Sequence, residues 1–141
     1  IAGATMGSQL AAVPSAEGVV TKVSPHSVEE TIRRLDEVVR AKGLTVFTRV
    51  DHRAGAREVG LDMQDEQVLI FGSPRAGTPL MVARPLVGLD LPLRVLVWRG
   101  SDGRVWASYQ DTAFLAKRYG LPDGLEKNIA AVGALVDQAL K

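Results

Sequence analysis

Residues 18–43, GVVTKVSPHSVEETIRRLDEVVRAKG, decide the fold because a strand, a turn and an amphipathic helix follow one another directly. The run Gly18 to Val23 is rich in branched residues, which favour strands. Ser27–Glu30 has the pattern of a capping box, and Gly43 suits the left-handed residue that ends a helix. Between them, four apolar residues recur at helical spacing: Val28, Ile32, Leu35 and Val39. A strand followed by a helix is predicted here.

Strand patterns dominate the next part of the chain. Strands are predicted over residues 44–50, 68–71, 93–99 and 104–109, with a helical turn or loop over 51–60 and a loop over 73–78. Thr78–Pro79 resembles a cap followed by a first-turn proline, and predicts a short helix over 80–83. Asp111 or Thr112 begins a helix that ends at Gly120. A last helix is expected from Pro122, with an apolar stripe of Leu125, Ile129, Val132, Val136 and Leu140.

The order of these elements predicts an α+β fold: strand–helix–four strands–helix, with an antiparallel sheet and the helices packed on one face. Residues 18–141 are expected to form this single domain. Residues 1–17 are small and weakly polar, and are expected to be a disordered arm, a leader remnant or a tag. A leader would imply a periplasmic protein, whereas an arm or tag leaves a cytoplasmic one equally open.

The hairpin over residues 93–109 has apolar side chains on both of its faces. One face carries Leu93, Val95, Val97, Val105, Ala107 and Tyr109. The other carries Leu96, Trp98 and Trp106, where a one-sided sheet would be polar. A further helix, a second copy of the chain or a ligand is therefore expected to cover this second face.

The composition excludes several classes of function. Lys and Arg total 17 against 16 for Asp and Glu, and they are scattered, which disfavours nucleic-acid binding. The absence of cysteine excludes disulfides and thiolate chemistry. No apolar run approaches the roughly 20 residues that cross a bilayer, so no membrane partner is expected. No cofactor motif is present, and none is predicted.

Several short motifs together resemble the domain of unknown function 302 family over about residues 18–140. They are Ser24–Thr31, Val46–His52, Leu69–Pro74, Gly77–Met81, Asp90–Leu93, Val97–Trp98, Val105–Trp106, Tyr109 and Asp111. The resemblance implies the fold given above and a homodimer, and it implies no activity. Ser73 and Gln110 stand where the family usually has asparagine, and Gln64–Asp65 where it has arginine–proline. An amide-dependent site would therefore be altered here.

Metal binding and acid–base catalysis are two candidate chemistries. The only histidines, His26 and His52, are the candidate metal ligands, although both are expected at strand ends and at opposite edges of the sheet. Asp90 follows an apolar stretch, so burial could shift its pKa, although aspartates in turns commonly bind backbone amides instead. Asp90 with His52 is the candidate acid–base pair, if the two side chains meet. Asp51 beside His52 is a weaker pair, since strand neighbours point to opposite faces.

Anion binding is the third candidate chemistry. The glycine-containing segment 72–78 precedes a predicted helix start, where free amides attract anions, and Arg75 adds a positive charge. A tight connection that needs glycine and proline for backbone reasons explains the same residues. Ser73, Arg75, Gly77, Thr78 and Asp90 are the candidate ligand-binding residues.

The leading hypothesis is a homodimeric domain that binds a small ligand, for which an anion is one option, in a pocket formed by these loops, without catalysis. One alternative is an enzyme that uses Asp90 and His52 as an acid–base pair. Another is a periplasmic accessory protein associated with metal or stress, which the leader-like segment Leu10–Ala16 suggests. The sequence leaves open whether the protein is an enzyme.

Overall fold

A computed structural model describes residues 13–141. Its centre is a five-stranded sheet in the order β1-β5-β4-β3-β2, and every neighbouring pair of strands is antiparallel. The strands are β1 (Val19–Ser24), β2 (Thr45–Asp51), β3 (Glu66–Gly72), β4 (Leu93–Arg99) and β5 (Val105–Gln110). The predicted α+β class and the antiparallel sheet of five strands are confirmed.

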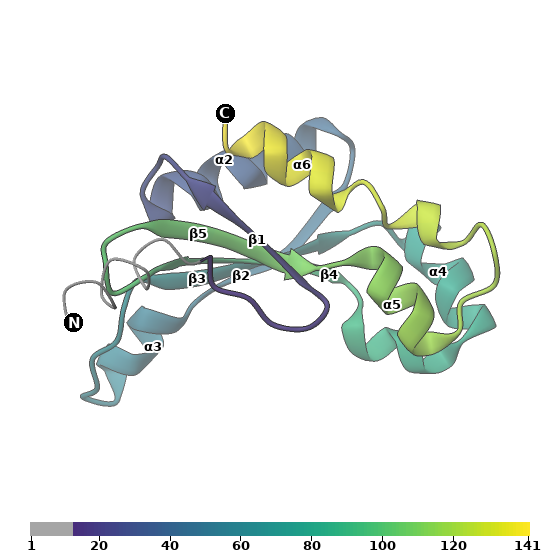
Figure 1. The fold of residues 1–141 in the computed structure, drawn as a ribbon, viewed down its shortest axis with the longest axis horizontal. Helices are drawn as coiled ribbons and strands as arrows, with labels where there is room; N and C mark the ends of the chain where they lie inside the picture. The colour runs from purple at the N-terminus through teal and green to yellow at the C-terminus, as the bar shows by residue number, and fades with distance from the viewer. Residues whose placement is uncertain (1–12) are drawn as a thin grey trace, which may run out of the picture.

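Two helices cover one face of the sheet. Helices α2 (Val28–Ala41) and α6 (Val132–Ala139) lie side by side on it, as Figure 1 shows. Their apolar stripes meet the inward side chains of the central strands, and the largest of these buried groups are Ile32, Leu35, Leu69 and Phe71. This cluster is the main core. We call the face under α2 and α6 the inner face of the sheet, and the opposite one the outer face.

Helix α2 begins and ends where the sequence predicts. The Ser27 hydroxyl accepts the backbone N–H of Glu30 at 3.0 Å, and Gly43 has a φ of 77°. The Glu30 carboxylate does not reach back to complete the capping box; it binds Arg33 instead. Both ends of this helix are fixed by short-range contacts, which explains why the sequence predicts them well.

Three more helices extend from the strand ends. They are α3 (His52–Glu58) after β2, α4 (Pro74–Ala83) after β3, and α5 (Thr112–Tyr119) after β5. A 3₁₀ helix, η1 (Pro85–Asp90), joins α4 to β4. Figure 1 shows α4 and α5 together at one end of the molecule and α3 at the other. A second core cluster holds the α4–α5 end together, and it contains Leu80, Val87, Leu115 and Ile129.

The prediction for the last helix is wrong in part. Instead of one helix from Pro122, the structure has a short 3₁₀ helix, η2 (Glu126–Asn128), followed by turns and α6. Ile129 is buried in the second cluster, whereas Val132 and Val136 are buried in the main core. One straight helix could not reach both cores, so the chain bends between them.

The outer face of the sheet is apolar and partly buried at its centre. Trp106 is 4% exposed, and its ring lies 6.5 Å from that of the half-buried Trp98. The Trp98 indole N–H donates to the Ser108 hydroxyl at 3.0 Å. Val23, the cross-strand neighbour of Trp106, and Val50 of the edge strand β2 are exposed. The predicted apolar character of this face is therefore present, and α2 and α6 do not cover it.

Candidate functional site

A cavity of about 290 Å³ lies between the α4 end of the sheet and α6. It is partly open to solvent. Its wall comes from the end of β3, the first two turns of α4, the segment before β4, Phe47 of β2, and the η2–α6 segment. The lining residues are Leu44, Phe47, Gly72, Ser73, Pro74, Ala76, Gly77, Thr78, Met81, Leu91, Pro92, Leu93, Asn128, Ile129, Ala131, Val132 and Leu135.

Carbon atoms dominate this lining. Its polar side chains are Ser73, Thr78 and Asn128. The Asn128 amide donates to the carbonyl of Ala76, another residue of the wall, at 3.2 Å. Ser73 makes no capping bond to α4, so its hydroxyl is available to a bound molecule. No ionisable side chain belongs to the wall. The cavity is therefore suited to an apolar molecule with one or two polar atoms.

The start of α4 gives the cavity its shape, and it differs from the prediction. Ser73 is extended, with φ −141° and ψ 127°, and Pro74 occupies the first helical position. The predicted loop over 73–78 and the predicted start at Thr78 are therefore wrong. Pro79 lies inside α4, where it removes one backbone donor. Residues 73–79 hold two pairs in which a hydroxyl residue precedes a proline, Ser73–Pro74 and Thr78–Pro79, and the helix begins at the first of them.

The structure divides the five predicted ligand-binding residues into three groups. Ser73, Gly77 and Thr78 line the cavity. Arg75 is exposed and outside the wall, and Asp90 lies in a separate polar cluster. The anionic ligand predicted from Arg75 is therefore not favoured at this cavity, because Arg75 does not belong to its wall.

Asp90 ends η1 and joins it to β5 and α5. Its carboxylate accepts a hydrogen bond from the Gln110 amide at 3.0 Å and another from the Tyr119 hydroxyl, and it pairs with Arg118 at 3.3 Å. Burial, which leaves this side chain 14% exposed, would by itself raise the pKa of Asp90. The bonds from Tyr119 and Gln110, with Arg118 and Arg94, outweigh it and lower that pKa. Asp90 is therefore a charged anchor between segments.

Asp90 and His52 do not meet. Asp51, the residue before His52, pairs with Gln67 at the start of β3. Leu93, three residues after Asp90, pairs with Phe71 near the end of β3. Gln67 and Phe71 are roughly 13 Å apart along this strand. The predicted acid–base pair is contradicted, because its members lie at opposite ends of the sheet. Asp51 serves as the N-cap of α3 and accepts the Ala54 N–H at 3.0 Å.

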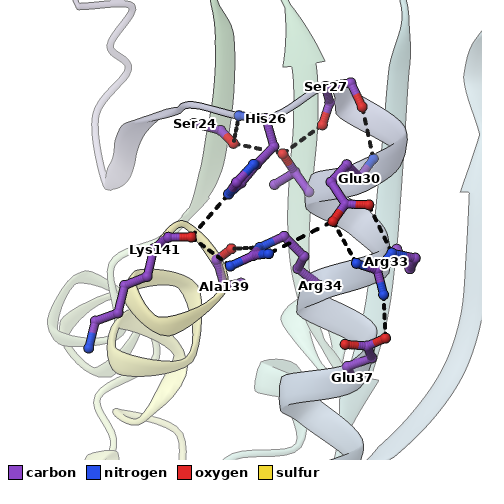
Figure 2. Close-up of polar contacts among 10 residues, drawn as sticks. Ser24, His26, Ser27, Glu30, Arg33, Arg34, Glu37, Ala139 and Lys141 are labelled. Atoms are coloured by element: carbon purple, nitrogen blue, oxygen red, sulfur yellow. Dashed lines mark hydrogen bonds and ion pairs between the residues drawn. The ribbon is translucent and has the colours of Figure 1, made fainter.

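The two candidate metal ligands are also apart. His26 follows β1 and His52 follows β2, and these strands form opposite edges of the sheet, roughly 19 Å apart by strand spacing. The His26 ring lies 3.1 Å from the Lys141 carbonyl oxygen, as Figure 2 shows. Within residues 13–141, no three His, Asp or Glu side chains are placed to hold a metal ion.

Most of the cavity wall was missed by sequence reasoning. Phe47 reaches it because a register shift between Val46 and Thr48 interrupts the alternation of β2. Leu91, Asn128 and Ile129 reach it because the chain bends after η2 and the α4–α5 end folds against the sheet. No motif in the sequence marks Phe47 as a cavity residue, because its exposure and the edge position of β2 are known only from the structure.

Comparison with solved structures gives a match to the fold. A crystal structure described as an uncharacterized conserved protein DUF302 from Bacillus stearothermophilus superposes with a TM-score of 0.73. The match covers 89% of this chain and 97% of that one, at 21% sequence identity. Identity this low supports a shared fold and nothing finer.

Comparison with curated proteins gives closer matches in sequence. Fluoride-specific ion channel FluC 1 of Brucella suis biovar 1 is 47% identical over 113 residues, which is 80% of this chain and 44% of that protein. Fluoride-specific ion channel FluC 2 of Brucella melitensis biotype 1 is 47% identical over the same length, 41% of its own. The chain thus spans less than half of these curated relatives.

The family comparison covers almost the whole described domain. The family described as Domain of unknown function DUF302 matches residues 20–141, from β1 through α6. This range includes the sheet, the cavity wall and the Asp90 cluster. The chain belongs to the DUF302 family.

Proposed function

We propose that the protein binds a small, largely apolar molecule in the cavity beside α4 and α6, and that it carries out no chemical step on it. The supporting observation is the wall itself: a volume of about 290 Å³ enclosed by aliphatic and aromatic groups, with the Ser73 hydroxyl at its edge. Apolar burial would supply the affinity, and the hydroxyl would orient one polar atom of the ligand.

The mouth of the cavity supports the same proposal. Two residues of the cavity lining are exposed: Phe47, a large aromatic side chain that is 49% exposed, and Met81. A molecule seated in the cavity would remove part of both side chains from water. Methionine adapts to different shapes, so this wall suits a class of ligands rather than one rigid compound.

Gly77 allows a direct test, because it lines the cavity from inside α4. A Cβ atom there would lie 3.7 Å from Leu91 and 3.8 Å from Met81, so a larger side chain would occupy ligand space. We expect short alcohols and small aromatics to raise the Tm of the wild type, and Gly77→Leu to abolish that increase. Gly55→Leu is the matched control, since Gly55 is helical and has no atom within 4 Å. An equal increase in both variants would contradict the proposal.

A homodimer is the second part of the proposal. The outer face of the sheet supports it, because exposed Val23 and Val50 flank the half-buried side chains of Val68, Ile70 and Leu96. Such a face is typical of a protein interface. Ile70→Glu should leave a monomer by light scattering at micromolar concentration, while Val59→Glu, at an exposed position beyond α3, should not. A monomeric wild type would contradict this part.

A second candidate function follows from the curated relatives, whose names describe fluoride channels. Because 80% of this chain aligns with one part of those proteins, it is a candidate accessory domain of an ion channel of this kind. Co-purification of the tagged chain with a fluoride channel from the same organism would test it. No association under conditions that preserve the channel would contradict this candidate.

A further inference from the structure

The α4–η1 segment has an exposed apolar surface that the cavity does not use. Val82, Leu86 and Leu89 are 78%, 70% and 70% exposed, which is unusual for three large aliphatic side chains within eight residues. We call these three residues the α4–η1 patch. Single exposed aliphatic residues need no explanation, but a cluster on one projecting end is typical of an interaction surface.

Helical geometry places Leu86 and Leu89 outward together, and Val82 is exposed on the preceding helix. Leu86 and Leu89 are three positions apart in a 3₁₀ helix and therefore share one side of it. Val87 and Asp90 share another side, where Val87 is buried and Asp90 is largely covered by its partners. On α4, Val82 follows exposed Arg75 and Pro79 at helical spacing, while Leu80 points into the second core. The core thus fixes the orientation of the patch.

The charged side chains near the patch in the sequence are mainly basic. Residues 67–98 contain three arginines, Arg75, Arg84 and Arg94, all exposed, and Asp90 is their only acidic residue, although the whole chain is nearly balanced. Arg94 donates to the Leu89 carbonyl at 3.1 Å, and Arg84 lies beside Gly120 at the end of α5. Arg118 pairs with Asp90 and neutralises the acidic group. Aliphatic side chains therefore project from a surface that is net positive.

We propose that the α4–η1 patch binds the surface of a bilayer that contains anionic lipid, with Val82, Leu86 and Leu89 in the headgroup region and Arg75, Arg84 and Arg94 against the lipid phosphates. Apolar insertion and basic charge together are what peripheral membrane binding requires. The patch contains no Tyr, Trp or Phe, the aromatic side chains that are enriched in protein interfaces, and this favours a lipid surface over a protein partner.

The position of the α4–η1 patch is compatible with contact to a bilayer surface. Figure 1 shows α4 and α5 projecting from the end of the sheet, away from the layer of α2 and α6. Among residues 13–141, no helix is long and apolar enough to cross a membrane, so the contact would lie on the bilayer surface. This proposal goes beyond the expectation of no membrane partner, which rested only on the absence of a spanning segment.

Vesicle co-sedimentation tests the proposal. We expect the chain to bind vesicles of phosphatidylcholine mixed equally with phosphatidylglycerol, and not vesicles of phosphatidylcholine alone. Salt at about 0.5 M should weaken binding, because it screens the arginines. The double variant Leu86→Ser with Leu89→Ser should bind roughly tenfold more weakly, since it removes the inserted groups. Val59→Ser with Leu61→Ser is the matched control and should bind as the wild type does, because these equally exposed residues lie near α3.

The charged residues need their own pair of variants. Arg75→Gln with Arg84→Gln should weaken binding roughly tenfold, whereas Lys42→Gln with Arg57→Gln should not, although it removes the same net charge. Equal binding to both vesicle types, or equal binding by patch and control variants, would overturn the proposal. Light scattering without lipid would also overturn it if the wild type were a dimer and the variant Leu86→Ser with Leu89→Ser a monomer. The patch would then be a subunit interface.

Discussion

Asp90 at the end of η1 accepts a hydrogen bond from the hydroxyl of Tyr119 at the end of α5, 29 positions further along the chain. The same carboxylate holds Gln110 of β5 and Arg118. Asp90→Ala would leave these partners without their acceptor, so we expect the free energy of unfolding to fall by about 1–3 kcal/mol. Urea unfolding at neutral pH measures this loss. Tyr119→Phe should have a smaller effect, because Gln110 and Arg118 remain bound.

Acid should weaken the fold through Asp90. Its pKa is below the ordinary aspartate value in the folded protein, so the folded state favours the charged form. Its contribution to stability is therefore complete at neutral pH and is lost as the pH falls from about 4 through the folded-state pKa. Urea midpoints between pH 7 and pH 3 should decline less for Asp90→Asn than for the wild type. Parallel declines would show that Asp90 does not carry this dependence.

Gly18 is expected to tolerate no side chain. It has a φ of +74°, and a Cβ atom there would lie 2.4 Å from the Phe114 ring. Gly43 has a φ of +77° with nothing within 4 Å, so Gly43→Ala measures the cost of the backbone conformation alone, about 1 kcal/mol. Gly18→Ala should lower the unfolding free energy by clearly more. Adding Phe114→Ala should cost less in the Gly18→Ala background than in the wild type.

Replacing Gly77 with alanine is expected to raise stability, unlike the same change at Gly18. Gly77 lies inside α4 without a positive φ, and a Cβ atom would make only ordinary contacts. Gly77→Ala should therefore stabilise the protein by about 0.5–1 kcal/mol through helix propensity. Gly133 is the matched position in α6, where a Cβ atom would lie 3.1 Å from the Tyr109 hydroxyl. Gly133→Ala should gain less or lose stability. Equal gains in thermal unfolding would contradict this account.

Arg34 is expected to hold the end of α6 against α2. Its guanidinium donates to the Ala139 carbonyl at 2.9 Å and to the Lys141 carbonyl at 2.6 Å, as seen in Figure 2. Carbonyls at a helix end lack intrahelical partners, so these bonds replace solvent. Arg34→Ala should cost about 1 kcal/mol in urea unfolding. Arg40→Ala on the same helix should cost less, because the exposed Arg40 side chain forms an ion pair with Asp36 at the helix surface.

Local signals explain what the sequence predicted well. The ends of α2 and α5 depend on Ser27, Gly43, Asp111 and Gly120, each acting on amides or carbonyls within a few residues. The start of α4 was misplaced because Ser73–Pro74 and Thr78–Pro79 carry the same signal, and only packing of Leu80 into the second core distinguishes them. The cavity could not be predicted, because its wall joins segments that meet only in the folded chain.

The central claim is that the cavity receives an apolar molecule, and methyl-detected NMR tests it most directly. Titration with 1-hexanol should shift the methyl signals of Leu91, Ile129 and Leu135, which line the cavity, and leave that of Ile70 on the outer face unchanged. Gly77→Leu should abolish the shifts, whereas Gly55→Leu should retain them. Shifts confined to exposed residues such as Val59 and Leu61, or no saturable shift at all, would contradict the account.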